Sequence, residues 1–215
     1  MSKYLKEFRV SEKLSRYVDA FWVSRNTSGE AINWPVVPDG CSDIIFYLNN
    51  SKKLEGINDT FVTGIMEQAQ LIPIIRRMEF FGIRFKPGIL FCLFKSDMSK
   101  LTNGMVELRQ LDKNIYKKLS IDTLAEKDEI IATVTPLLEK IIEECTREDR
   151  FLQAVTDLTD NPNMTIDELA ASCNWSTKNL EQIFIKRMGL TPKKFARIMR
   201  FQKAYKKFIK KDWRI

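Results

Sequence analysis

The hydrophobic pattern of the chain changes its period once, near residue 122, and this change limits the fold more than any other feature. Before that point, apolar residues form short runs or alternate with polar ones, as Phe81, Ile83 and Phe85 do. A period of two is typical of β-strands. After that point, apolar residues recur every three or four positions, which is typical of amphipathic helices. The sequence therefore predicts an α+β protein with a β-rich front half and an all-α end.

The front half predicts short antiparallel strands that form a barrel or sandwich. Turn signals at Asp39-Gly40 and Pro87-Gly88 separate apolar runs. Asp39 and Asp43 are interpreted as turn residues, since carboxylates there are scattered. The candidate strands cover residues 16–23, 44–48, 60–65, 72–75 and 79–85.

Most aromatic residues also lie in the front half, and some of them are candidates for lining a small-molecule pocket. Core filling is the commoner role of such side chains, so both interpretations stay open. The candidate ligand-binding residues are Trp22, Trp34, Phe46 and Phe85.

An amphipathic helix is predicted from about residue 126 to residue 145. Its apolar stripe runs from Ile130 to Cys145, and Pro136 lies inside it. Proline removes a helical hydrogen bond, so we expect a kink near Thr135 or two abutting helices. The stripe would either pack within the monomer or form a dimer interface.

The charge of +7 is concentrated at the end of the chain. Residues 165–215 hold 13 Lys and Arg against four Asp and Glu, whereas residues 1–164 hold 22 against 24. A basic segment on a slightly acidic body favours a polyanion partner, although a solvated basic helix would show the same counts.

Composition also excludes several kinds of chemistry. The chain has no histidine, which excludes Ser-His and Cys-His catalytic pairs and histidine metal sites. We expect no catalysis, no metal and no cofactor. Four widely spaced cysteines, without a C-x-x-C motif, are interpreted as reduced thiols. No apolar run is long enough to span a membrane or to act as a signal peptide, so a cytoplasmic protein without membrane contact is expected.

From residue 150 onward, helix start and stop signals follow one another closely. Thr165 and Glu168 have the spacing of a capping box, and Ser176 is a second N-cap. Asn174 suits a tight turn, and Gly189 suits a helix end. Two short helices joined by a four-residue turn are typical of a helix-turn-helix, which places its second helix in the DNA major groove.

The exposed face predicted for the second helix is polar, as a helix that enters a groove requires. A plain helical hairpin with a solvated face is the alternative, and the local positive charge disfavours it. Lysines there can neutralise phosphates, and Gln and Glu can contact adenine or cytosine edges. The face consists of Thr177, Lys178, Glu181, Gln182, Ile185 and Lys186.

A spaced set of residues between positions 150 and 210 matches a known pattern. The set consists of Leu169-Ala170, Ser176, Leu180, Ile183-Phe184, Lys186-Arg187, Gly189, Thr191-Pro192, Phe195, Arg200 and Ala204. With these residues, the segment resembles the first helix-turn-helix of AraC/XylS-type transcription regulators. Residues 38–46 (PDGCSDIIF) and 81–88 (FGIRFKPG) resemble the cupin-like sensor domain found in some of these regulators.

The resemblance implies three parts and a set of DNA contacts. The parts are a cupin-like sensor domain (1–121), a helical connector and candidate dimer interface (122–147), and a helix-turn-helix domain (148–215). Family members commonly have Gln or Arg where this chain has Glu181. The family's second helix-turn-helix should begin where this sequence stops, so relative to the family we expect either a truncated module or a natural half-module. The DNA-binding residues it implies are Ser176, Thr177, Lys178, Glu181, Gln182, Lys186 and Arg200.

The leading hypothesis is a DNA-binding transcription regulator that couples sensing or association to a major-groove helix-turn-helix. Its expected partners are double-stranded DNA, a small-molecule effector and a second copy of the chain. The alternative is an interaction protein, a half-module that dimerises with related regulators without reading DNA sequence. An enzymatic or ligand-binding barrel with an incidental helical tail is the weakest of the three hypotheses.

Overall fold

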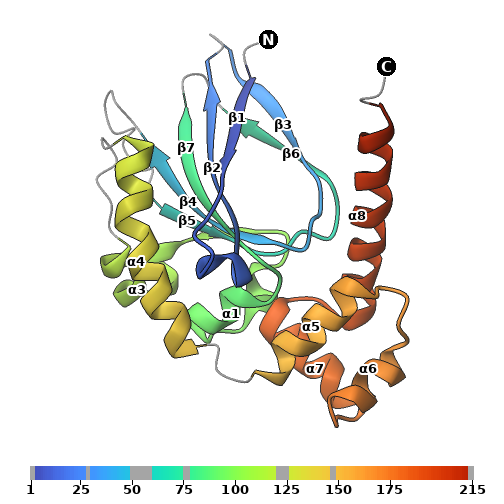
Figure 1. The fold of residues 1–215 in the computed structure, drawn as a ribbon. Coiled ribbons are helices and arrows are strands. Elements are labelled where there is room, and N and C mark those ends of the chain that lie inside the picture. Colours follow the sequence, from blue (N-terminus) through green and yellow to red (C-terminus); the bar gives the residue numbers. More distant parts are fainter. Residues whose placement is uncertain are drawn as a thin grey trace.

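The computed structural model describes residues 3–27, 30–48, 60–74, 78–119, 126–145 and 149–212. Strands occupy the first half of the chain, and helices fill the second half (Figure 1). The predicted α+β class is therefore confirmed.

The main sheet has six strands in the order β1-β2-β7-β4-β5-β8, and every neighbouring pair is antiparallel. A separate two-stranded sheet pairs β3 with β6. The predicted strands near residues 16–23, 44–48, 60–65, 72–75 and 79–85 are all present, with shifted ends, while β1, β3 and β8 were not predicted. The strands are β1 (Lys3–Phe8), β2 (Val18–Asn26), β3 (Ile32–Val36), β4 (Ser42–Leu48), β5 (Thr60–Thr63), β6 (Gln70–Ile74), β7 (Glu79–Phe85) and β8 (Met105–Glu107).

The six-stranded sheet has one apolar face, which forms the larger core. Phe81 on β7 lies opposite Val23 on β2 and Phe46 on β4, and all three are buried. The rings of Phe21 and Phe81 stack with centroids 5.8 Å apart. Alternation along the strands explains this face, because every second side chain points to the same side. The same alternation leaves Trp22, Gly82 and Arg84 on the opposite face.

Helix α4 (Lys127–Cys145) closes this core together with the short helix α1 (Ile89–Phe94). The helix is continuous through Pro136, so the expectation of two abutting helices was wrong. Its stripe, including Ile130, Val134 and Leu138, is buried against the core of its own chain. The stripe thus packs within the monomer, and a dimer contact by other parts of this segment stays a prediction.

Besides α1, four short helical segments interrupt the β-rich half, and none of the five was expected from the sequence. Their length explains this, because three to six residues are too few to display a helical period. The four are η1 (Leu14–Arg16), η2 (Met98–Leu101), α2 (Leu108–Leu111) and α3 (Lys113–Lys118).

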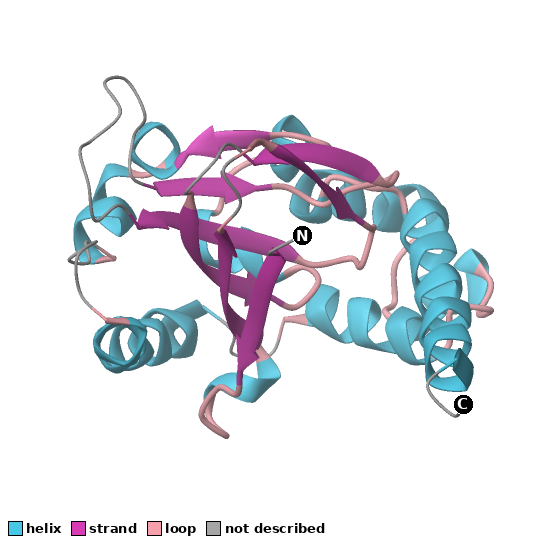
Figure 2. Ribbon diagram, turned by 90° about the horizontal axis from the view of Figure 1, so that it is seen from above, coloured by secondary structure: helices cyan, strands magenta, loops and turns pink. Residues whose placement is uncertain are grey.

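The second half forms a smaller core from four helices, α5 (Arg150–Asp160), α6 (Ile166–Ser172), α7 (Thr177–Met188) and α8 (Pro192–Asp212). We call residues 149–212 the helix unit and the described residues of 3–145 the sheet unit. The two units lie against each other, and the long α8 stands beside the strands (Figures 1 and 2).

Helical spacing in the sequence predicts one apolar side of α8, formed by Phe195, Ile198, Met199, Ala204 and Phe208, but only half of that side is buried. Phe195, Ile198 and Met199 are buried, but Ala204 is exposed and Phe208 is 66% exposed. The first turns of α8 pack on the helix unit, and the later turns extend past it.

Two further findings concern the cysteines and the hydrophobicity of the helices. Cys41, Cys92 and Cys173 are free thiols, as expected. Among the residues that the structure describes, no helix is both long and apolar enough to cross a membrane.

Candidate nucleic-acid interface

The turn between α6 and α7 is held by the local interactions that the sequence predicts. The Thr165 hydroxyl accepts a hydrogen bond from the Glu168 backbone N–H, and the Glu168 carboxylate accepts one from the Thr165 N–H. Asn174 adopts a left-handed conformation with φ of 55°. Ser176 caps α7, and Gly189 ends it with φ of 90°. The capping box, the turn and both ends of α7 are thus confirmed.

Aromatic packing fixes α7 against its neighbours. The ring of Phe184 meets Phe151 of α5 edge-on, with centroids 5.3 Å apart, and lies 6.4 Å from Phe195 of α8. Leu180 is also fully buried on this side of α7. One face of α7 is therefore anchored, and the opposite face is turned outward.

The outward face of α7 carries the side chains that sequence analysis proposed for base and phosphate contacts. Lys178, Glu181, Gln182 and Lys186 are all exposed. Neither lysine forms an ion pair with any described residue. The structure thus brings these four residues together on one open helical face, while their contacts with DNA stay a prediction.

The other three proposed DNA-binding residues have local structural roles. The hydroxyl of Thr177 donates to Asp167 at 2.8 Å, and that of Ser176 accepts from the Asn179 backbone N–H. Arg200 donates from Nη1 to the Pro162 carbonyl at 2.6 Å, which ties α8 to the turn before α6. Ser176 and Thr177 lie at the start of α7. Arg200 lies on α8 and contacts the turn before α6, so it is not part of the α7 face.

Residues of the sheet unit contact the C-terminal end of α7. The Thr102 hydroxyl donates to the Gly189 carbonyl at 2.9 Å, next to η2. A Cβ at Gly189 would lie 2.3 Å from the same hydroxyl, so only glycine allows this approach. Asp97, the N-cap of η2, has a lowered pKa, chiefly because the Ser99 hydroxyl and N–H donate to it.

Further contacts join α8 to the loops of the sheet unit. Lys194 pairs with Glu67 at 2.8 Å, and Gln202 donates from its side-chain amide to the Pro38 carbonyl at 2.5 Å. Gly40 lies under α8, where a Cβ would come within 2.5 Å of the Met199 side chain. The helix unit is therefore seated on the sheet unit through both α7 and α8.

The four candidate ligand-binding aromatics do not line a shared pocket among the described residues. Phe46 and Phe85 are 1% and 0% exposed and belong to the apolar core, so they fill space there. Trp22 lies on the opposite face of the same sheet, and Trp34 lies on the separate β3–β6 pair. The placement of these four residues does not support the proposal that they form one binding site.

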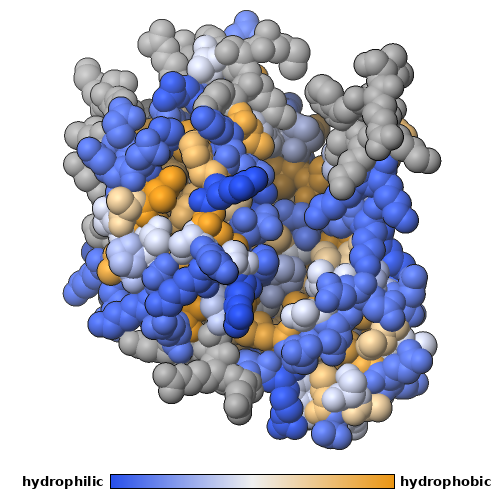
Figure 3. Space-filling model, in the orientation of Figure 1, coloured by the Kyte–Doolittle hydropathy of each residue, from blue (hydrophilic) through white to orange (hydrophobic). Residues whose placement is uncertain are grey.

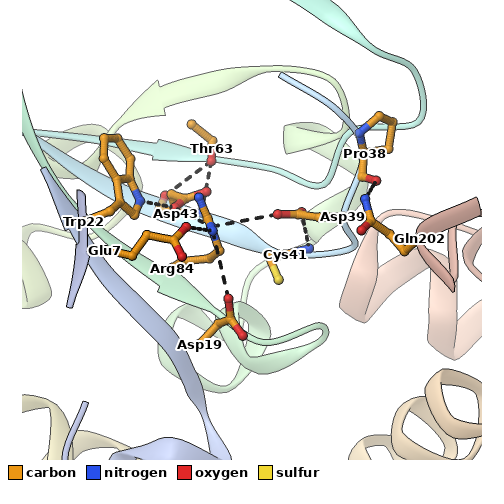
Figure 4. Close-up of polar contacts among 10 residues, drawn as sticks. All are labelled: Glu7, Asp19, Trp22, Pro38, Asp39, Cys41, Asp43, Thr63, Arg84 and Gln202. Carbon is orange, nitrogen blue, oxygen red and sulfur yellow. Dashed lines mark hydrogen bonds and ion pairs between the residues drawn. The ribbon is translucent and has the colours of Figure 1, made fainter. Parts of the chain in front are cut away.

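A polar cluster on that opposite face was missed by sequence reasoning (Figure 4). Arg84 on β7 lies 2.7 Å from Glu7 and within 4 Å of three further carboxylates, those of Asp19, Asp39 and Asp43. The Trp22 indole N–H donates to Asp43 at 2.7 Å. We call these five charged residues the Arg84 cluster.

The interpretation of Asp43 as a turn residue was wrong, because Asp43 lies within β4. Asp39 does sit in a turn, where it accepts from the Cys41 N–H at 2.8 Å. Strand pairing sets Asp43 opposite Arg84, and only this long-range register brings the charges together. One feature of the sequence could have indicated the cluster. Arg84 stands between the apolar Ile83 and Phe85, and a polar residue at such a position of a strand points to the opposite face of the sheet.

Burial changes the acid–base properties of the cluster. It raises the pKa of Asp43 to about 6, although Arg84 and Trp22 oppose the shift. Burial likewise raises the pKa of Asp39 and of the Cys41 thiol. Burial lowers the pKa of Arg84, but Asp43 and Asp39 outweigh it and hold that pKa above its usual value. The Nε of Arg84 is buried and makes no hydrogen bond with any described residue.

The described residues contain no group of three or more Cys, Asp or Glu side chains arranged to hold a metal ion. The carboxylates around Arg84 are instead directed at a guanidinium. The cluster is therefore a partly buried ion-pair network centred on Arg84.

Comparison with known proteins gives two matches. Residues 6–107, just under half of the chain, match the model of a domain of unknown function, DUF6597. The chain is also similar to the crystal structure of the AraC-like transcriptional activator CuxR, with 11% sequence identity over 95% of each chain and a TM-score of 0.27. That score is too low to establish a common architecture. No curated protein matches the sequence.

Proposed function

We propose that this protein is a DNA-binding transcription regulator in which α7 enters the major groove of double-stranded DNA. The observation that carries the proposal is the open face of α7, with Lys178, Glu181, Gln182 and Lys186 on one side of a capped and anchored helix. In this role the lysines neutralise phosphates, and Gln182 and Glu181 face base edges. The AraC-like resemblance of the sequence supports the same role.

The sheet unit would regulate this activity through its contacts with α7 and α8. No catalytic step is proposed. A single helix-turn-helix makes few base contacts, so two copies on one duplex would bind more tightly and more selectively than one. A homodimer and a small-molecule effector are parts of the proposal.

The test is the affinity for duplex DNA measured against salt concentration. Neutralised phosphates release counterions, so the logarithm of the association constant should fall with the logarithm of salt at a slope of about −0.9 for each phosphate contact. Lys178→Gln with Lys186→Gln should weaken binding and reduce the magnitude of the slope by about two. The matched control, Arg109→Gln with Lys117→Gln, removes two exposed charges from α2 and α3 and should change little.

A slope near zero for the unmodified protein would rule out DNA binding by this route. Equal effects of the two double variants would mean that the α7 face is not the contact surface.

The alternative is an interaction protein that associates with related regulators without reading DNA sequence. Exposed aromatic residues on α8 favour it, since Phe201 and Tyr205 stack on the helix surface with centroids 5.6 Å apart and Phe208 follows one turn later. Such a protein would associate with partners through α8 but show no preference among DNA sequences.

A further inference from the structure

A cleft at the junction of the two units lies outside the proposed DNA contacts. It holds about 690 Å³ and lies between α5 on one side and η1 with the β7–α1 turn on the other. Figure 3 shows the surface hollowed where the sheet unit meets the helix unit, with apolar and hydrophilic residues side by side. Pockets for small organic molecules are commonly of this size and often lie between structural units.

Three cationic side chains from three different elements line this cleft. Arg16 ends η1, Lys86 follows β7, and Arg150 begins α5. Within the part of the chain that the structure describes, neither Arg16 nor Lys86 has a carboxylate within 4 Å. Their charges are therefore available to a bound anion.

The acidic residues of the cleft do not cancel these charges. Asp149 lines the cleft, but its carboxylate pairs with Arg187 at 2.7 Å and caps α5 through the Phe151 N–H. Asp160 lies at the other end of α5 from Arg150, about ten residues and 15 Å of helix away. Among the residues that the structure describes, the end of the cleft near Arg150 is thus positive.

The wall between the cations is apolar. Pro87, Ile89 and Leu152 contribute to it, from the β7–α1 turn, α1 and α5. A ligand that suits both features has a negatively charged group and an apolar body. We propose that this cleft binds a small organic carboxylate with an apolar body, held by Arg16, Lys86 and Arg150.

Arg150 also connects the cleft to the turn before α7. Its Nη1 lies 3.5 Å from the Cys173 carbonyl, and its guanidinium lies 5.5 Å from the centre of the Trp175 ring. A bound carboxylate shares Arg150 with this turn, so occupancy of the cleft acts on the segment that orients α7. The binding itself goes beyond the proposed DNA contacts and does not depend on them.

The experiment is a calorimetric titration of the full chain with 1-naphthoate in the absence of DNA, and with the uncharged 1-naphthamide as the matched ligand. We expect saturable binding of one naphthoate with a dissociation constant below about 1 mM, and at least tenfold weaker binding of the amide. Arg16→Gln with Lys86→Gln should weaken naphthoate binding about tenfold or more. Arg109→Gln with Lys117→Gln, which alters the same net charge elsewhere, should leave it within about twofold.

A second pair of variants keeps the test available if the double variant does not fold. Thr156 is exposed on α5 and lines the cleft. Thr156→Glu places a carboxylate there and should weaken naphthoate binding more than the neutral Thr156→Gln does. The proposal is overturned if naphthoate shows no saturable binding, if the amide binds equally well, or if cleft and control variants behave alike. Loss of DNA binding with intact naphthoate binding would instead contradict only the proposed function.

Discussion

The helix unit and the sheet unit use charge in opposite ways. On α7, Lys178 and Lys186 are exposed and form no ion pair with described residues. In the sheet unit, Arg84 is 21% exposed and lies among four carboxylates. Exposed charges contribute little to stability and remain available to a partner, whereas enclosed charges depend on one another. The difference teaches that the positive charge set among carboxylates in the sheet unit is not the positive charge that we propose contacts DNA.

The largest expected effect comes from removing the central cation of the Arg84 cluster. Arg84→Gln leaves the carboxylates of Asp39, Asp43 and Glu7 without their counterion, and it should lower the free energy of unfolding at pH 7 by about 3 kcal/mol. Lys186→Gln should change it by no more than about 0.5 kcal/mol. Urea unfolding followed by circular dichroism measures both. Equal losses of unfolding free energy for the two variants would contradict the difference between the two units.

A smaller effect concerns the pH dependence that Asp43 gives to stability. Its pKa is about 6 in the folded protein against 3.8 for an ordinary aspartate. Because the folded value is the higher one, the contribution of Asp43 to stability is complete below pH 3.8 and is lost as the pH rises through 6. Asp43→Asn stays neutral throughout and still offers an oxygen to the Trp22 indole N–H. Relative to the unmodified protein, the variant should therefore gain about 2 kcal/mol between pH 4 and pH 7.

Unfolding curves at several pH values for the two proteins provide the measurement. Lys186→Gln is the matched exposed variant, and its difference from the unmodified protein should not vary over this range. A constant difference for Asp43→Asn as well would mean that Asp43 ionises normally and that the cluster is open to solvent.

The smallest effect lies in the helix unit, where stability depends on local caps. Thr165→Ala removes the acceptor for the Glu168 N–H and should cost about 1 kcal/mol. Thr165→Ser retains the hydroxyl and should cost less. If Thr165→Ala lowers the free energy of unfolding as much as Arg84→Gln does, the two units do not differ in the way this account states.

The same contrast explains which features could be predicted from sequence. Thr165, Asn174, Ser176 and Gly189 act on neighbours within a few residues, so their roles were visible in the sequence. The Arg84 cluster joins residues that are up to 77 positions apart, and it depends on a strand register that alternation alone does not specify.

Other misses have similar causes. The short segments η2 and α1 are set by packing rather than by a helical period. The far turns of α8 have apolar residues at helical spacing, but the described residues offer no core for Phe208 to enter. The cleft between the units depends on how α5 is seated on the sheet unit, which no local pattern records.

The central claim is that the open face of α7 reads DNA sequence. Selection of binding sites from a randomised pool of duplexes, with the unmodified protein and with Gln182→Ala, tests it most directly. We expect the unmodified protein to enrich a defined short sequence and Gln182→Ala to lose preference at one base pair of it, at a cost of about 1–3 kcal/mol there. Enrichment of no sequence by the unmodified protein, or an identical preference in Gln182→Ala, would contradict the claim.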